Sequence, residues 1–149
     1  TIGDLAGPMA FAILMGSSRA FYGKFGDKIN LERFMQYSAV LCMVSYLMIA
    51  FIPVPALGIL GCAVCGLSVG IMWPGTFSMA AASVKRGGTA LFALLALAGD
   101  VGCSSGPTYV GMISGALNDN LKLGIVAALI FPVLMIMGIK MIGSLRKYD

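Results

Sequence analysis

One carboxylate and two hydroxyls lie in a long apolar segment, where they could bind a polar solute or carry a proton. Asp100 is followed by Ser104 and Thr108 at intervals of four residues, so a helix would align all three. Asp100 lies about 18 Å along that helix, near the middle of a bilayer. A charge at that depth is costly and is functional by default. We expect it to couple a proton or bind substrate; a structural hydrogen bond to a neighbouring helix is the alternative.

Proline and glycine occur beside this stripe and in the preceding apolar run. Proline removes a backbone hydrogen bond, and broken helices expose carbonyls near transport sites. Trp73, the only Trp, could stack on a sugar ring, but a packing or interface role is the favoured interpretation. The expected helix-break and packing residues are Pro74, Gly75, Gly102, Gly106 and Pro107.

Metal chemistry and most catalytic mechanisms are disfavoured. The chain has no His, and its cysteines (Cys42, Cys62, Cys65 and Cys103) lie within apolar runs. Zinc needs three or four protein ligands, so the cysteines are predicted to be free packing thiols without a metal. An intramembrane aspartyl protease needs two aspartates, and only Asp100 lies near the middle of a run. We expect neither enzyme activity nor a cofactor.

The elements that must hold these residues are membrane helices. The 149 residues are 59% hydrophobic and 11% charged, with a mean hydropathy of +0.95. A soluble domain carries about 25% charged residues, so this chain is predicted to be an integral, all-α polytopic bundle in contact with lipid. The net charge of +4 is therefore attributed to membrane orientation rather than to nucleic-acid binding.

Five apolar runs are each long enough for the roughly 20 residues that a spanning helix needs. Short connections make successive helices antiparallel neighbours. Glycine is concentrated in the third and fourth runs, where helices are expected to pack closely, and Gly58, Cys62, Gly66 and Gly70 recur every four residues. The predicted spans are residues 2–21, 33–52, 55–83, 88–117 and 121–144.

Basic residues predict the orientation of the bundle. Alternating helices would place most of them on one side, which the positive-inside rule makes cytoplasmic, together with the C-terminus. Arg19 and Lys140 could snorkel towards that side, and the opposite side has only Lys122. The residues on the basic side are Lys24, Lys28, Arg33, Lys85, Arg86, Arg146 and Lys147.

The charged connection between the first two runs resembles the loop signature of the Major Facilitator Superfamily. Gly23, Asp27, Lys28 and Arg33 match its pattern, whereas Asn30 stands where the family usually has Gly. Gly23 would let helix ends approach closely, and Asp27 could lie at a neighbouring helix N-terminus. In the family this loop acts as a conformational latch.

The third and fourth runs are similar to the tenth and eleventh helices of bacterial sugar- or fucose-permease-like members. The resemblance implies helices eight to twelve of a twelve-helix secondary transporter in the bacterial inner membrane. It also implies a small-molecule substrate and an N-terminal half, absent from this sequence, as partner. The chain begins at Thr and is expected to be a piece of a longer protein. A five-span structural or assembly subunit without transport activity is the alternative.

Overall fold

The computed structural model describes residues 2–84 and 86–145, without the side chains of residues 2–4, 27 and 145, and this part of the chain is helical. The elements are α1 (Ile2–Phe25), the short 3₁₀ helix η1 (Gly26–Lys28), α2 (Leu31–Phe51), α3 (Pro55–Val69), α4 (Met72–Ser83), α5 (Gly88–Ala116), α6 (Leu121–Ala127) and α7 (Ile130–Leu145). The prediction of an all-α bundle is confirmed, and the helices begin and end close to the predicted bounds.

Four helical stretches are long and apolar enough to cross a membrane. They are Leu31–Phe51, Pro55–Ser83, Gly88–Ala116 and Leu121–Ser144. The chain is thus an integral membrane protein by length and composition. The fifth expected span corresponds to α1, which has 24 residues but is less apolar because Ser17, Ser18 and Arg19 interrupt it. Its crossing of the membrane stays a prediction.

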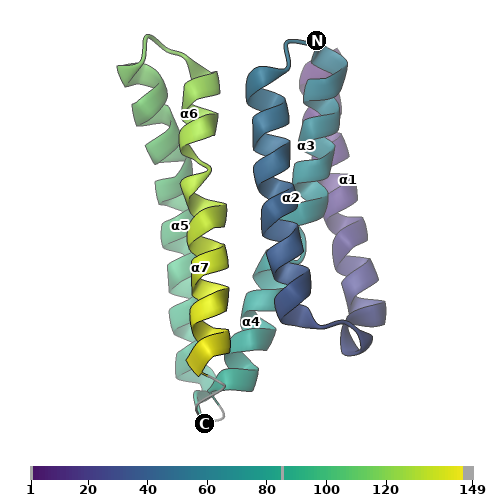
Figure 1. Cartoon of the computed structure of the whole chain (residues 1–149), viewed down its shortest axis with the longest axis vertical. Coiled ribbons are helices and arrows are strands. Elements are labelled where there is room, and N and C mark those ends of the chain that lie inside the picture. The colour runs from purple at the N-terminus through teal and green to yellow at the C-terminus, as the bar shows by residue number, and fades with distance from the viewer. Residues whose placement is uncertain (1, 85, 146–149) are drawn as a thin grey trace.

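The helices form two groups that α4 connects (Figure 1). In the first group α3 packs on both α1 and α2, and in the second α5 packs on α6. Helix α4 continues from α3 and reaches α5, while α2 contacts α6 and α7. The buried core accordingly lies around α2 and α3, and it includes Met35, Ala39, Cys42 and Ile71. Helix α5 leaves most of its surface uncovered by the described residues.

Helices α1 and α3 are held together by backbone contact at two glycines. A Cβ atom added at Gly66 would overlap the Phe11 carbonyl, and one added at Gly70 would lie 2.8 Å from the Met15 carbonyl oxygen. Small residues spaced by four let helix backbones approach in this way in membranes. The predicted packing stripe is confirmed at these two positions, whereas Gly58 has no atom within 4 Å of its added Cβ.

Asparagine side chains begin two of the helices. The Asn30 Oδ1 accepts a hydrogen bond from the Arg33 backbone N–H at 3.2 Å, and Asn120 accepts one from the Leu123 N–H at 3.4 Å. Asn30 has φ of −68°, so it acts as a helix N-cap and not as the left-handed turn residue that a family glycine would supply. Left-handed backbone occurs instead at Asn118 and Asp119, with φ of 58° and 57°, where α5 turns into α6.

Replacing Asn30 by alanine should destabilise the start of α2. The Arg33 N–H would lose its acceptor, at a cost of about 1 kcal/mol in the free energy of unfolding. Detergent-induced unfolding of the purified protein measures this cost. Asn30→Asp is the matched control, since a carboxylate also caps a helix, and equal losses in both variants would contradict the capping role.

Helix breaks occur at two of the prolines, and one break was not predicted. The third span is interrupted at Gly70–Ile71, ahead of Pro74, as the sequence indicated. The predicted break at Gly106–Pro107 is wrong, because α5 runs through Pro107 without interruption. The last span is broken at residues 128–129 instead, where Pro132 lacks the N–H that would bond to the Ala128 carbonyl; the Phe131 N–H bonds to that carbonyl at 3.1 Å.

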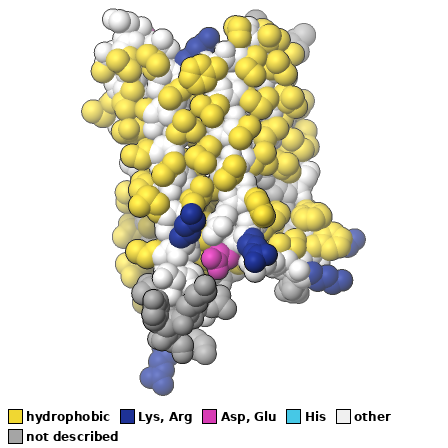
Figure 2. Space-filling model, in the orientation of Figure 1, with side chains coloured by type: hydrophobic (Ala, Val, Ile, Leu, Met, Phe, Trp, Pro, Cys, Tyr) yellow, Lys and Arg dark blue, Asp and Glu magenta, His cyan; other side chains and the backbone are white. Residues whose placement is uncertain are grey.

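Basic residues gather at one end of the bundle (Figure 2). Lys24 ends α1, Lys28 follows in η1, and Arg86 lies between α4 and α5, all at the end where Figure 1 shows the C-terminus. Lys122, in α6, lies at the opposite end. The described residues therefore show the predicted charge asymmetry. Lys85, Arg146 and Lys147 lie outside the described residues.

Candidate functional site

A cavity of about 650 Å³, the central cavity, lies where α1, α2, α4, α5 and α7 approach one another. Most of its wall is apolar, but opposite charges face it from separate helices, Arg19 from α1 and Asp100 from α5. This size and composition are typical of pockets for small molecules. The polar, thiol and aromatic groups on its wall are Arg19, Cys42, Tyr46, Trp73, Thr76, Asp100, Cys103 and Phe131.

Arg19 is positioned by the break between α3 and α4. Pro74 has no N–H, so the Gly70 carbonyl lacks the donor that residue 74 would supply in a regular helix. The Arg19 Nε donates a hydrogen bond to this carbonyl at 3.3 Å. Gly70 lies near the middle of Pro55–Ser83. The expectation that Arg19 snorkels to the basic end is therefore wrong: its side chain is directed to the middle of the neighbouring span.

The predicted polar stripe of α5 is present, and its hydroxyls bond within the helix. Ser104 Oγ donates to the Asp100 carbonyl at 3.0 Å, and Thr108 Oγ1 donates to the Ser104 carbonyl at 2.8 Å. Their lone pairs stay free to accept hydrogen bonds. The stripe also lines a second, shallower cavity of about 590 Å³ on the surface of α5. Asp100 lines both cavities, so the two cavities adjoin at this residue.

Trp73 joins α4 to α5 and also faces the central cavity. Its ring packs directly on Gly99, and a Cβ atom at that position would overlap the indole. Trp73 and Phe77 have ring centroids 4.7 Å apart, and Phe77 stacks on Phe92 of α5 at 5.7 Å. The favoured packing role of Trp73 is thus confirmed, while 45% of the residue stays exposed and available to a ligand.

The glycines predicted to pack differ in their surroundings. Gly75 is buried against α2, where its added Cβ would lie 2.8 Å from the Met35 sulfur, so its packing role is confirmed. Among the described residues, no atom lies within 4 Å of a Cβ added at Gly102 or Gly106. Helices α4 and α6 cover other faces of α5, so close packing of these two glycines stays a prediction.

The charged loop is only partly described. Gly23 has no neighbour within 4 Å of its added Cβ, so the expected close approach of helix ends does not occur among the described residues. The side chains of Lys28 and Arg33 are exposed, as anchors at a headgroup surface would be. The side chain of Asp27 lies outside the described residues, and its predicted contact with a helix N-terminus stays a prediction.

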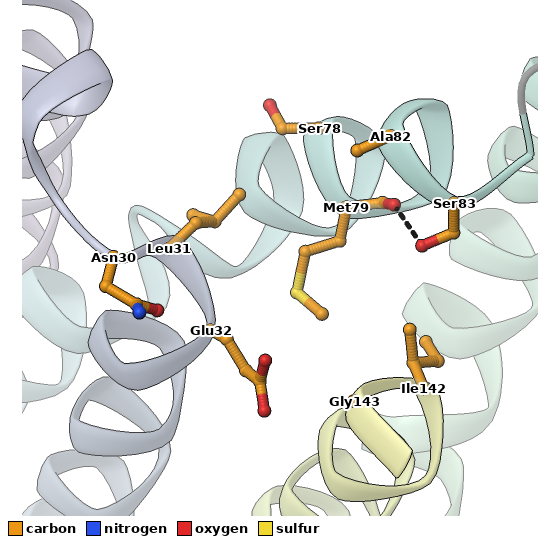
Figure 3. Close-up of a pocket in the computed structure, with 9 residues that line it drawn as sticks. All are labelled: Asn30, Leu31, Glu32, Ser78, Met79, Ala82, Ser83, Ile142 and Gly143. Atoms are coloured by element: carbon orange, nitrogen blue, oxygen red, sulfur yellow. Dashed lines mark hydrogen bonds between the residues drawn. The ribbon is translucent and has the colours of Figure 1, made fainter. Parts of the chain in front are cut away.

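A further cavity of about 520 Å³ lies at the basic end, between the first turn of α2 and the last turns of α4 and α7 (Figure 3). Glu32 points into it, close to the backbone of α7 at Gly143. Ser83 also borders it, but its hydroxyl donates to the Met79 carbonyl at 2.8 Å. Among the described residues that line this cavity, Glu32 is the charged one.

Sequence reasoning found Asp100, Trp73 and the α4 break, but it missed the rest of the central wall. The sequence pattern placed the Arg19 side chain at the basic surface and gave no prediction for Tyr46 or Thr76. A signal for Arg19 was available, since a cation inside an apolar segment is a functional residue by default. Thr76 gave no signal, because a single threonine close to a proline is common in membrane helices.

The central cavity combines a fixed guanidinium, a carboxylate, hydroxyls and an aromatic ring at mid-span. Such groups can bind a small polar solute and can exchange a proton. No family model, curated protein or solved structure matches this chain.

Proposed function

We propose that this chain is part of a secondary active transporter of the major facilitator type, not an enzyme. It would move a small solute by alternating access, coupled to a proton or another ion through Asp100. The observation that carries the proposal is the central cavity, which both Asp100 and Arg19 border. Asp100 lies near the middle of α5, and the Arg19 side chain is bonded to Gly70, near the middle of Pro55–Ser83. Charges at that depth are found on substrate and ion paths.

The helix break beside the cavity supports transport over a purely structural role. Interrupted helices at mid-span are typical of transporter sites, where freed carbonyls face the solute path. Here the Gly70 carbonyl lacks an N–H donor because residue 74 is proline, and it accepts a hydrogen bond from the Arg19 Nε instead. A change in the angle between α3 and α4 at Gly70–Ile71 would alter the cavity, whereas a passive subunit needs neither the break nor the charges.

The uncovered surface of α5 supports the presence of further transporter helices. Asp100, Ser104 and Thr108 border a shallow cavity on this surface. In a bilayer a carboxylate facing lipid would be costly. We propose that the other half of the transporter covers this stripe, leaves a water-filled path beside it and gives Gly102 and Gly106 their packing partner.

The orientation and membrane complete the proposal. Basic residues gather at one end of the bundle, so this end would face the cytoplasm by the positive-inside rule. α1 would be the fifth crossing, because it packs along α3. The bacterial inner membrane follows from the sequence resemblance, and lipid and the solute are the proposed partners.

Asp100→Asn tests the transport mechanism. Vesicles containing the full-length protein would be given labelled sugars and sugar acids, and uptake would be followed with and without an imposed proton gradient. We expect the variant to lose gradient-driven accumulation, by about tenfold or more, because an amide cannot carry the proton. Asp119→Asn, at the end of α5, is the matched control and should accumulate solute normally.

Two outcomes would overturn this account. Unchanged gradient-driven uptake in Asp100→Asn would remove Asp100 from coupling. Absence of any uptake by the wild-type protein would favour the structural or assembly subunit.

A further inference from the structure

We propose that the substrate is a small solute bearing one carboxylate, and that Arg19 binds this carboxylate in the central cavity. The inference rests on the proposed transport function and names its substrate class. The proposed substrate is an acid and not a neutral sugar, because the wall of the cavity carries the Arg19 cation, which favours a negatively charged group.

The Gly70 carbonyl holds the guanidinium while leaving most of its donors free. Among the described residues Arg19 makes one side-chain hydrogen bond, from Nε to Gly70. A guanidinium carries five N–H donors, so the four on the terminal nitrogens remain available. Two parallel N–H groups of this fork match the two oxygens of a carboxylate. The carbonyl at the helix break thus orients the Arg19 side chain but leaves the N–H donors of its terminal nitrogens without a partner among the described residues.

The charge of Arg19 has no bonded counter-ion among the described residues. Asp100 borders the same cavity, yet no hydrogen bond joins it to Arg19. Arg19 lies in the last two turns of α1, but its side chain is bonded to Gly70, near the middle of Pro55–Ser83. A cation held at that depth is costly unless an anion or water neutralises it. An anionic substrate supplies that neutralisation when it binds, which gives the site a physical preference for a negative charge.

The other wall residues limit the size and charge of the anion. Of the described residues on the wall, Arg19 is the one cation, which suits a single carboxylate better than a phosphate with two charges. Trp73 provides an apolar surface for the body of the solute. Thr76 Oγ1 already donates to the Met72 carbonyl at 2.7 Å, so it can only accept from the ligand, as Asp100 can when ionised. A hydroxyl or ammonium group on the solute would donate hydrogen bonds to Thr76 and Asp100.

Matched pairs of probes test the inference on the purified full-length protein. Each pair contains an acid and a neutral analogue: D-glucuronate and D-glucose, L-lactate and propane-1,2-diol, L-alanine and L-alaninamide. Binding is measured by calorimetry and by thermal stabilisation. We expect at least one acid to bind about tenfold or more tightly than its analogue, and Arg19→Gln to remove this preference. Arg19→Lys should keep part of it, because the charge remains but the fork does not. Lys140→Gln, at the basic end of α7, should leave it unchanged.

A double variant separates ligand binding from support of the helix break. Pro74→Ala restores an N–H that can bond to the Gly70 carbonyl, so Arg19 is no longer needed there. In this background Arg19→Gln should still lose the preference for the acid. Retention of the preference, or acids binding no better than their analogues throughout the panel, would overturn the inference. If the protein then takes up a neutral sugar, the proposed transport function holds and the carboxylate site does not. If acids bind but are not taken up, the carboxylate site holds and the proposed transport function does not.

Discussion

Replacing Gly66 by alanine is expected to separate α1 from α3 and to lower the free energy of unfolding by about 1–3 kcal/mol or more. The added Cβ would overlap the Phe11 carbonyl oxygen, which belongs to a helix backbone and cannot rotate away. One helix must then move, and the contacts at Gly70 and Ser18 would be lost with it. Unfolding in a graded series of sodium dodecyl sulfate concentrations, followed by circular dichroism, measures the loss.

Gly58→Ala is the matched control on the same helix. No described atom lies within 4 Å of its added Cβ, so the variant gains helix propensity without a clash. It should be as stable as the wild-type protein or slightly more stable. Equal destabilisation of both variants would contradict the packing of α1 on α3 through Gly66.

Replacing Gly99 by alanine is expected to displace Trp73 from α5 and to change the central cavity. The added methyl would occupy the position of the outer edge of the indole ring, whose centroid lies 4.7 Å from that of Phe77, so the indole must move. The cost should again be about 1–3 kcal/mol. Trp73 is the only Trp of the 149 residues, so its fluorescence emission and quenching report the displacement once tryptophans elsewhere in the full-length protein are replaced by phenylalanine.

Gly102→Ala is the control for this second variant. Gly102 lies one turn further along α5, with no described atom within 4 Å of its added Cβ. Its Trp73 emission should match the wild type. A normal Trp73 signal in Gly99→Ala would show that the indole does not pack on α5.

The helix positions were predictable because lipid imposes a simple rule on the backbone. Every N–H and C=O in hydrocarbon needs an internal partner, so an apolar run of sufficient length becomes a helix. The expected span 33–52 corresponds to α2, Leu31–Phe51, and the expected span 88–117 corresponds to α5, Gly88–Ala116. Small residues spaced by four on α3 also predicted a packing face.

The helix breaks were less predictable, because a proline removes one hydrogen bond but does not decide what replaces it. At Pro74 the unpaired Gly70 carbonyl accepts a hydrogen bond from Arg19, which is distant in sequence. At Pro132 the preceding turn tightens, with the Leu129 N–H bonding to Val126 at 3.1 Å. Helix α5 continues through Pro107. Sequence alone gives these prolines equal weight, and the tertiary neighbours separate them.

The candidate site was also predictable only where a residue's role depends on its own position in the sequence and not on its neighbours in the fold. Asp100 was predictable from its depth in an apolar run, because the cost of a buried charge is a property of one position. The place of Arg19 depends on how α1 packs against the α3–α4 break, which no local pattern encodes. Gly102 and Gly106 were assigned a packing role from their size, yet burial is set by neighbours, and among the described residues they have none.

The central claim is that a water-accessible cavity with charged groups on its mainly apolar wall lies between the helices, and Cys103 reports on it directly. Cys103 is exposed on the cavity wall beside Asp100, whereas Cys65 is buried in α3. A thiol reacts as its thiolate, which forms in water and not in lipid. Membrane vesicles of both orientations would be treated with a charged methanethiosulfonate and each cysteine read by mass spectrometry. The account predicts modification of Cys103 from at least one side, with Cys65 unmodified. Cys103 that reacts only after denaturation would contradict it.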